Sequence, residues 1–534
     1  MRFAKRGWIG LGIIIGGYLV AAGWVWTHSA PLIPDRPVTI RIAHWQVEAG
    51  PPDGMDAVIK RYEQLNPRVR VLQQLIPGIV YKQWMRTNLA SGSGADIIEW
   101  GAWLEGVRDV PARYFEPVTE ALGQPNPYNK GTVLEKTPWQ KTFKDNLQGS
   151  RNDSPDPGQI FGVTMTECSV RLFCNRQLLR EATGSEHVPQ TFDEMRKIFL
   201  QLDAYSQRTG HRVMGIAGAK DNAEWLLQYL LMDTTLGLNF SIDDSGMLSM
   251  YNRQVLAAYL DGRWNWSRPE VRAGLELLRD VGRHMKPGFL QLQRDEATRE
   301  FLAGDALFIF TGTWDATSLK RLASFEVGAL RFPQPAKDDP IAGPYLIGRF
   351  QDGGGVTAMA MHLTKNSAHK AEALDFMRFM TSLEGQQLFT DGSGWLPATL
   401  EVKIPPAIQS FVSPLDGYTM CQPYSIIGST VTMEFERNLH LLLGQNGSVD
   451  RYVAELDRVM PAAVRADLQT EVSSTLITLR AQDARMIAQA RLSGPTQEGI
   501  YHAGQRALME SGQTLAEATT MQMMRQLKTA GPAE

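Results

Sequence analysis

Thirteen tryptophans and several acidic residues at predicted strand ends are the side chains of this sequence with the clearest chemical use. Sugars present hydroxyl groups and apolar C–H faces, so a sugar site needs aromatic rings as platforms with polar side chains around them. Trp314 is the strongest candidate platform, because the small residues Gly312 and Thr313 leave room for a sugar face at its ring. Five tryptophans lie at predicted strand ends or in glycine-flanked loops, where open α/β sheets place ligand sites: Trp45, Trp100, Trp103, Trp314 and Trp395.

Catalytic motifs are missing from the sequence. It contains no H-E-x-x-H pair, no G-x-S-x-G elbow and no phosphate-binding loop, and Gly353–Gly355 precedes its predicted strand, unlike a dinucleotide turn. Glu99 and Glu105 could cleave a glycosidic bond only if their carboxyl groups stood roughly 5 to 9 Å apart across a sugar. We therefore predict a protein that is not an enzyme, with no catalytic residue, no metal and no cofactor.

Charge and cysteine content exclude two further classes. The net charge of −3 provides no positive field for a polyanion, so nucleic acid is not an expected partner. Three cysteines are too few for a thiolate metal site or a disulfide framework. Cys168 and Cys174 are expected as free, buried thiols, since an extended segment would hold them about 20 Å apart; a disulfide across a turn is the alternative.

The N-terminus has the pattern of a membrane anchor. Three basic residues precede an uncharged run from Trp8 to Trp26, close to the roughly 20 residues that span a bilayer. The run is long for a cleaved signal, and His28 weakens the cleavage site. We predict an uncleaved N-terminal transmembrane helix that places the rest of the chain on the periplasmic side of the bacterial inner membrane. Secretion to the periplasm after cleavage is the alternative.

The elements that must position the candidate residues alternate between strand and helix, which indicates a parallel or mixed sheet with helices on both faces. The expected order at the start is strand, helix, strand, helix, strand: 38–43, 55–65, 69–72, 81–90 and 95–100. A further strand begins at 159–164, where the chain is expected to enter a second lobe. Helices are expected at 191–209, capped by Thr191, and at 222–233, and the chain is helix-rich after 450 with a break at 493–495.

Several of these segments, taken in order, resemble the extracellular solute-binding proteins of family 1, the maltose-binding-type receptors of bacterial sugar ABC importers. The resemblance runs from about Val38 to about Gly447. It rests on VTIRIAHW, ASGSGADIIEWGAW, GQIFGVTMTECSVRLFCNRQLL, VPQTFDEM, REFLAGDALFIFTGTWD, VGALRFPQP, the GGGVTAMAMHLTKNSAHKAEALDFMRFMTSLEGQQLF stretch and SGWLPA. It implies two α/β lobes joined by crossing segments, with a ligand cleft between them.

The resemblance also implies ligand contacts. The Gly312–Trp314 turn matches the strand end that presents an aromatic ring to the cleft in that family. Residues similarly placed in family motifs are Trp45, Gln46, Glu99, Glu167, Trp225 and Trp395, and with Trp100 and Trp314 they form the predicted binding set. Two of them have another interpretation, since Glu167 could form a salt bridge between lobes and Trp225 could pack in a helical core.

The sequence thus predicts an α/β protein with a two-lobed periplasmic-binding-protein fold, an N-terminal transmembrane helix and a helical C-terminal extension. Its predicted role is to capture a mono- or oligosaccharide and deliver it to the membrane subunits of an ABC permease. The alternatives are a membrane-tethered glycan-active hydrolase or lyase, or a sensor or interaction protein with the same fold. The expected divisions of the chain are an anchor or signal at 1–30, a proline-rich spacer at 31–37, a first lobe at 38–158 and 300–352, a second lobe at 159–299 and 353–450, and the extension at 451–534. The extension either adds a helical layer to the second lobe or binds a partner.

Overall fold

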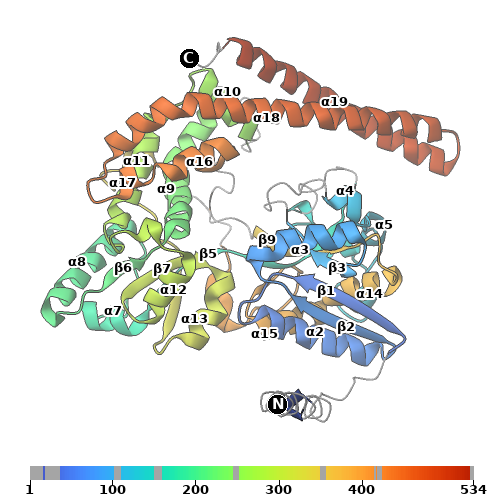
Figure 1. Cartoon of the computed structure of the whole chain (residues 1–534), viewed down its shortest axis with the longest axis horizontal. Helices are drawn as coiled ribbons and strands as arrows, with labels where there is room; N and C mark the ends of the chain where they lie inside the picture. The colour runs from blue at the N-terminus through green and yellow to red at the C-terminus, as the bar shows by residue number, and fades with distance from the viewer. Residues whose placement is uncertain are drawn as a thin grey trace, which may run out of the picture.

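The computed structural model describes residues 16–18, 36–101, 110–149, 159–243, 250, 252–348, 356–413, 417 and 424–529. Two β-sheets, each covered by helices, form two lobes that lie side by side, and a long helical hairpin extends from the second lobe (Figure 1). This is the α/β architecture that the alternating strands and helices predict.

The first lobe is built on a six-stranded mixed sheet with the strand order β10-β4-β9-β3-β1-β2. Strand β1, next to the edge strand β2, pairs in parallel with β2 and β3, while β9 runs antiparallel to β3 and β4. Ile40 and Ile42 of β1 are completely buried, as the alternating pattern of the segment predicts. The strands are β1 (Val38–His44), β2 (Val69–Leu75), β3 (Ile97–Glu99), β4 (Gly162–Cys168), β9 (Val356–Leu363) and β10 (Leu396–Pro397).

Helices cover both faces of this sheet. Helices α2 and α15 pack closely, since a Cβ atom at Gly54 would lie only 2.8 Å from the carbonyl oxygen of Phe389. Glycine at this position therefore allows the two helices to pack backbone against backbone. The helices of the first lobe are α2 (Pro51–Leu65), α3 (Gly78–Ser91), α4 (Val110–Tyr114), α5 (Thr119–Leu122), α14 (Lys370–Met380) and α15 (Leu383–Ser393).

The second lobe is built on a four-stranded sheet with the order β6-β7-β5-β8. The strands are β5 (Val170–Asn175), β6 (Met214–Ala217), β7 (Ala306–Gly312) and β8 (Val327–Leu330). Thr191 caps α8 as predicted, because its side chain accepts a hydrogen bond from the backbone N–H of Glu194 at 3.2 Å. The helices are α7 (Arg176–Thr183), α8 (Phe192–Thr209), α9 (Lys220–Ile242), α10 (Asn252–Leu260), α11 (Pro269–Gly282), α12 (Arg294–Leu302), α13 (Ala316–Leu322), α16 (Ser429–Arg437) and α17 (His440–Leu443).

The pairing of strands corrects the predicted lobe boundaries. The segment 300–352 was expected in the first lobe, yet β7 and β8 both pair with β5 in the second-lobe sheet. The segments 159–168 and 356–397 were expected in the second lobe, yet β4, β9 and β10 belong to the first-lobe sheet. Hydrophobic patterning identifies a strand but not the sheet that it joins, and both sheets here take strands from distant parts of the chain.

The C-terminal extension is a helical hairpin of α18 (Val449–Leu492) and α19 (Gln497–Thr529), with the break where the sequence predicts it. The first half of α18 is part of the second-lobe core, which includes Tyr452 and Leu456. Asp467 of α18 also caps α16, because its carboxylate accepts hydrogen bonds from the backbone N–H groups of Thr430 and Val431 at 3.0 and 2.8 Å. This part of the extension is therefore a helical layer on the second lobe.

The predicted membrane anchor and proline-rich spacer lie outside the described residues except for 16–18 and 36–37. Within the described parts of the chain, no helix has the length and apolar composition needed to cross a bilayer. Cys168 and Cys174 are buried free thiols, as predicted. Burial raises the pKa of each to about 12, so both carry their proton at neutral pH.

Candidate functional site

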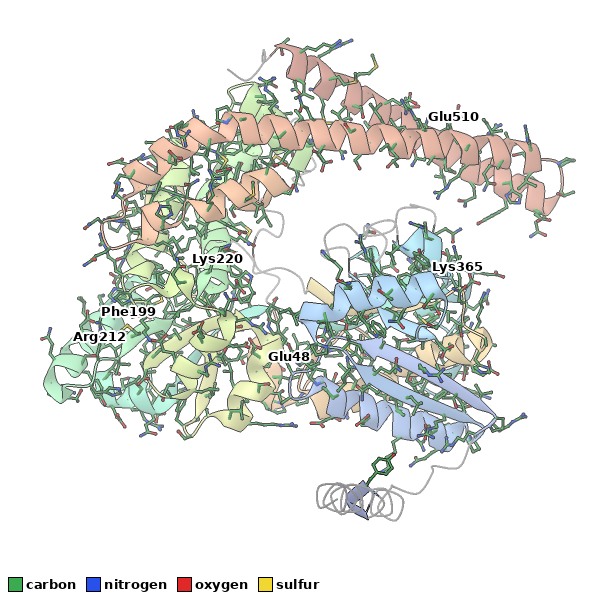
Figure 2. All side chains as sticks on the ribbon, viewed as in Figure 1. Glu48, Phe199, Arg212, Lys220, Lys365 and Glu510 are labelled. Atoms are coloured by element: carbon green, nitrogen blue, oxygen red, sulfur yellow. The ribbon has the colours of Figure 1, made fainter. Side chains whose placement is uncertain are left out.

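Polar side chains from both lobes meet at one junction. In the first lobe, parallel strands β1 and β3 end at the same edge of the sheet, which brings the loop after β1 next to Glu99. In the second lobe, β7 ends in the turn η4 (Thr313–Asp315), and α12 begins at Arg294. Glu48 marks this place in Figure 2, where the two lobes come together.

Glu99 is the most deeply buried acidic group of the junction, with no exposed surface. Its Oε1 accepts a hydrogen bond from the side-chain amide of Gln46 at 2.5 Å, and its Oε2 accepts one from the backbone N–H of Trp45 at 3.1 Å. Burial raises the pKa of Glu99 to about 8, and the two hydrogen bonds offset only part of that shift. Three predicted site residues, Trp45, Gln46 and Glu99, are therefore brought together.

A second acidic group of the first lobe faces a cation of the second. Arg294 lies with its guanidinium 3.9 Å from Oε1 of Glu48 and 3.7 Å from Oδ2 of Asp315. The hydroxyl of Thr311 donates a hydrogen bond to Asp315 at 2.6 Å. Burial raises the pKa of both Glu48 and Asp315, while the charge of Arg294 lowers it. Arg294 thus links the two lobes by charge.

Trp225 and Trp314 form an aromatic corner at the same junction. Their ring centroids lie 5.7 Å apart at an interplanar angle of 82°, an edge-to-face contact. Trp225 packs against the second-lobe core, whereas Trp314 packs against the core of the first lobe although it follows β7 of the second. The room expected beside Gly312 is filled by the indole of Trp314 itself, because a Cβ atom at Gly312 would overlap its ring carbons.

Trp45 and the predicted residues not yet placed make their other contacts within the first lobe. Trp45 contacts Tyr81 edge to face at a centroid distance of 4.9 Å. Glu167 forms an ion pair with Lys144 at 2.7 Å. Because both partners belong to the first lobe, this pair is not the salt bridge between lobes that was the alternative for Glu167.

Trp100 and Trp395 are buried in hydrophobic clusters, each with 2% of its surface exposed. Trp100 packs beside Phe115 and His362, with centroid distances of 6.5 and 5.4 Å. Trp395 belongs to the first-lobe core that Trp314 also contacts. Neither ring presents a surface at the junction. Trp103 and Glu105 lie outside the described residues.

Sequence reasoning missed Glu48, Arg294 and Asp315. Glu48 stands two residues after Gln46 and Asp315 directly follows Trp314, so both could have been found as polar neighbours of predicted residues. Arg294 gives no such signal, because it lies at the start of a helix far from the other two in sequence.

A charged group also stands beside Trp225 on α9. Lys220 forms ion pairs with Glu436 of α16 at 2.7 Å and with Glu224 at 3.3 Å. Burial, helped by the negative charge of Glu436, raises the pKa of Glu224 to about 7, although the charge of Lys220 lowers it. This part of the second lobe therefore carries a proton-sensitive carboxyl one residue from the aromatic corner.

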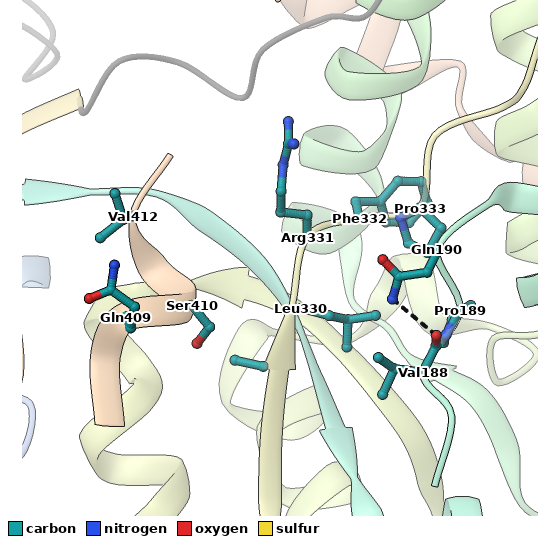
Figure 3. Close-up of a pocket in the computed structure, with 11 residues that line it drawn as sticks. Val188, Pro189, Gln190, Leu330, Arg331, Phe332, Pro333, Gln409, Ser410 and Val412 are labelled. Atoms are coloured by element: carbon teal, nitrogen blue, oxygen red, sulfur yellow. Dashed lines mark hydrogen bonds between the residues drawn. The ribbon is translucent and has the colours of Figure 1, made fainter. Parts of the chain in front are cut away.

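A separate pocket of about 480 Å³ lies beside the edge strand β8 of the second lobe (Figure 3). Leu330 lies at its centre, and Gln190 donates a hydrogen bond to the carbonyl oxygen of Val188 at 3.2 Å on one side. None of the predicted site residues lines it. Its lining is Val188, Pro189, Gln190, Ala329, Leu330, Arg331, Phe332, Pro333, Gln409, Ser410 and Val412.

The sequence matches the model of one protein family, described as bacterial extracellular solute-binding protein, over residues 58–412. The chain belongs to this family. The solute-binding protein is also 22% identical over 370 residues to a protein of Brucella abortus (strain 2308) that is named only as a candidate binding protein. The match covers 68% of this chain and 76% of that relative.

Solved structures with the same fold include sugar-binding proteins. The apo form of RafE from Streptococcus pneumoniae has a TM-score of 0.55 at 16% identity, covering 81% of the solute-binding protein and 99% of RafE. The unliganded and acarbose-bound GacH receptor of Streptomyces glaucescens gives the same values. Maltose-bound MalE3 of T. maritima has a TM-score of 0.52 at 17% identity, with 79% and 98% covered. At these identities the likeness establishes the fold of the solute-binding protein.

Proposed function

We propose that this receptor captures a mono- or oligosaccharide between its two lobes and delivers it to the membrane subunits of an ABC importer, without catalysis. The observation that carries the proposal is the corner of Trp225 and Trp314, two aromatic rings held where the lobes meet. Aromatic rings beside buried polar groups suit a ligand with apolar C–H faces and many hydroxyls. RafE in complex with raffinose and maltose-bound MalE3 share the fold and bind sugars.

The arrangement of Glu99 argues against the alternative of a hydrolase or lyase. Its carboxyl has no exposed surface, and both oxygens already accept hydrogen bonds from Gln46 and Trp45. In this conformation it cannot approach a glycosidic bond, which a catalytic carboxylate must do. Glu99 is therefore proposed as a positioning group that holds the loop after β1 in place.

Binding is proposed to close the lobes. Contacts between them already exist beside the junction, where the backbone N–H of Ala49 donates to Ser318 at 3.2 Å and the hydroxyl of Thr317 donates to the carbonyl oxygen of Ser393 at 2.8 Å. A ligand can shift the equilibrium between open and closed states only by binding one of them better. A sugar touched by both lobes meets that condition, with Arg294 and Glu48 adding a charge contact in the closed state.

We also propose that the receptor stays on the periplasmic side of the bacterial inner membrane, held by an uncleaved N-terminal helix. The support is the uncharged run from Trp8 to Trp26 behind three basic residues. Tethering keeps the receptor close to membrane subunits, which raises its effective concentration for them.

A thermal-shift and calorimetry screen of the purified full chain against mono- and oligosaccharides tests the proposed ligand class. We expect the melting temperature to rise by several degrees with one glycan or a related set, and the glycan to be recovered intact. No shift with any carbohydrate would exclude the sugar assignment, and cleaved glycan in the same wells would favour the enzyme alternative.

A further inference from the structure

One side of α19 exposes apolar side chains along most of its length. The opposite side faces α18, where His502 hydrogen-bonds to Gln489 at 2.5 Å and Gln513 donates to Asp483 at 2.6 Å. The hairpin projects well beyond the body of the second lobe (Figure 1), and Glu510 marks it in Figure 2. Three large side chains stand on the exposed side: Tyr501, Leu508 and Leu515, which are 59, 71 and 70% exposed.

These three residues follow a seven-residue spacing, the period of helices that pair in coiled coils. The residue three positions after each one is small. Together they form a face that we name the α19 seam: Tyr501, Gly504, Leu508, Ser511, Leu515 and Ala518. The positions flanking the seam are also uncharged: Ile500, Gln505, Ala507, Gly512, Thr514, Thr519 and Met521. The charged residues between 500 and 521 lie outside these positions: Arg506, Glu510 and Glu517.

The order of sizes along the seam determines which partner fits it. Large and small residues alternate along the seam. When a second copy of the helix runs in the opposite direction, each large residue therefore faces a small one. In an antiparallel pair of α19 helices, Tyr501 faces Ala518, Gly504 faces Leu515 and Leu508 faces Ser511, and each contact occurs twice about a two-fold axis. In a parallel pair, Tyr501 would instead face Tyr501 and Gly504 would face Gly504. Steric clashes between large side chains would then alternate with unfilled space between small ones.

We propose that the α19 seam joins two copies of this chain, α19 against α19 in antiparallel orientation about a two-fold axis. An exposed apolar face of this length marks an interaction site, and a surface that complements itself is what a two-fold interface requires. The small residues allow the helices to approach closely, so the large ones can fill the space opposite. A membrane surface fits the seam less well, because helices that lie on membranes carry Lys and Arg beside their apolar face. The proposal stands independently of the carbohydrate assignment.

Cysteine cross-linking in intact membranes tests the orientation of the pair. One tagged full-length chain carries Gly504→Cys and a second, differently tagged, carries Leu515→Cys. Facing positions lie within the Cα separation that a disulfide spans, about 4.4 to 6.8 Å. We expect a cross-linked pair only when the two are expressed together. A cross-link formed by Gly504→Cys alone would show a parallel pair, and no cross-link in any sample would exclude the pairing. The chain without added cysteines controls for its native thiols, of which Cys168 and Cys174 are buried.

Sedimentation of the full chain in density-matched detergent tests whether residues of the α19 seam form the dimer interface. We expect the mass of two chains for the native sequence and of one chain for Leu508→Glu combined with Leu515→Glu. The double variant should still unfold cooperatively on heating, because both side chains are exposed in the single chain. Ile477→Glu is the matched control, since Ile477 is 68% exposed on α18 of the same hairpin and lies outside the seam. It should leave the dimer intact. A monomeric native protein, or equal loss of the dimer in the control, would overturn the proposal, as would association only with other membrane proteins.

Discussion

The indole rings of Trp225 and Trp314 meet edge to face, with centroids 5.7 Å apart and planes at 82°. Trp225 is fixed on the long helix α9 by the second-lobe core, while Trp314 reaches the core of the first lobe. A substitution at this corner therefore alters the contact between the lobes, and measuring both ligand binding and stability distinguishes a binding role from a packing role.

Trp314→Ala is predicted to weaken glycan binding by roughly 1 to 4 kcal/mol, the range of an aromatic anchor, while the free energy of unfolding changes less. Calorimetry and urea unfolding measure the two quantities. Trp264→Ala is the control, because Trp264 is 1% exposed in the second-lobe core and its indole N–H donates to Val255 at 2.8 Å. It should cost about 3 to 5 kcal/mol of stability, as large-to-small core changes do. If Trp314→Ala destabilised the fold equally and bound glycan normally, Trp314 would be a packing residue only.

Arg294→Ala is predicted to favour the open state. The substitution leaves Glu48 and Asp315 facing each other without a cation, and burial already raises the pKa of both. Small-angle scattering should show a larger radius of gyration for the ligand-free variant than for the native protein. Arg321→Ala is the control, since Arg321 pairs with Asp53 between the lobes at 2.8 Å but both side chains are more than half exposed. An exposed pair contributes about 0 to 1 kcal/mol, so this variant should scatter like the native protein, and identical curves for all three would show that Arg294 does not bias closure.

Local sequence patterns predicted the elements of the fold well. The strand at 38–44, the cap at Thr191 and the break between α18 and α19 all lie where composition and periodicity place them. The membership of the lobes could not be derived in the same way. Strand β7 is buried along all seven residues. Its largely apolar sequence indicates an interior strand, but it does not indicate which of the two sheets the strand joins.

The candidate site was predicted in part. Trp45, Gln46 and Glu99 come together because parallel strands end at one edge, a relationship that strand order alone implies. Trp100 and Trp395 also follow strand ends, but their rings turn into the cores, since a tryptophan at a strand end can point to either face. The contact of Arg294 with Glu48 depends on how two lobes pack, which no local pattern records.

The N-terminus is predicted to remain uncleaved. The apolar run from Trp8 to Trp26 is longer than the roughly 7 to 15 residues of a secretory signal. Mass spectrometry of the protein extracted from membranes should therefore detect peptides from Met1 to Trp26. A mature chain that starts near Pro31 in a soluble fraction would show that the segment is a cleaved signal.

Removal of the chain from Ser493 onward is predicted to preserve glycan binding but to reduce stability. The removed helix α19 returns to the second lobe, where Met523 is 2% exposed and Gln526 donates to Asp261 at 2.7 Å. Losing a buried methionine alone costs about 2 to 5 kcal/mol, so urea should unfold the truncated protein at a lower concentration. Met523→Ala, which keeps the helix, should reproduce part of that loss. A folded truncated protein with no affinity for the glycan would assign α19 a direct role in binding.

Glu99→Gln is predicted to change how stability depends on pH. In the folded protein the pKa of Glu99 is raised to about 8, from an ordinary value of 4.5, so between these pH values the folded state holds a proton that the unfolded state has released. The stability from this group is therefore fully present below about pH 4.5 and is lost as pH rises through about 8.

Glutamine cannot ionise, and it replaces one acceptor with a donor facing Gln46 or Trp45, which costs about 1 kcal/mol. Urea unfolding should thus find the variant less stable than the native protein at pH 4 and more stable at pH 9. The buried His44 and His362, whose pKa values are lowered to about 4, favour the folded state as pH rises from 4 to 6.5, but they do so in both proteins and cancel in the difference. A gap between the two proteins that stays constant from pH 5 to 9 would mean that Glu99 is ionised throughout.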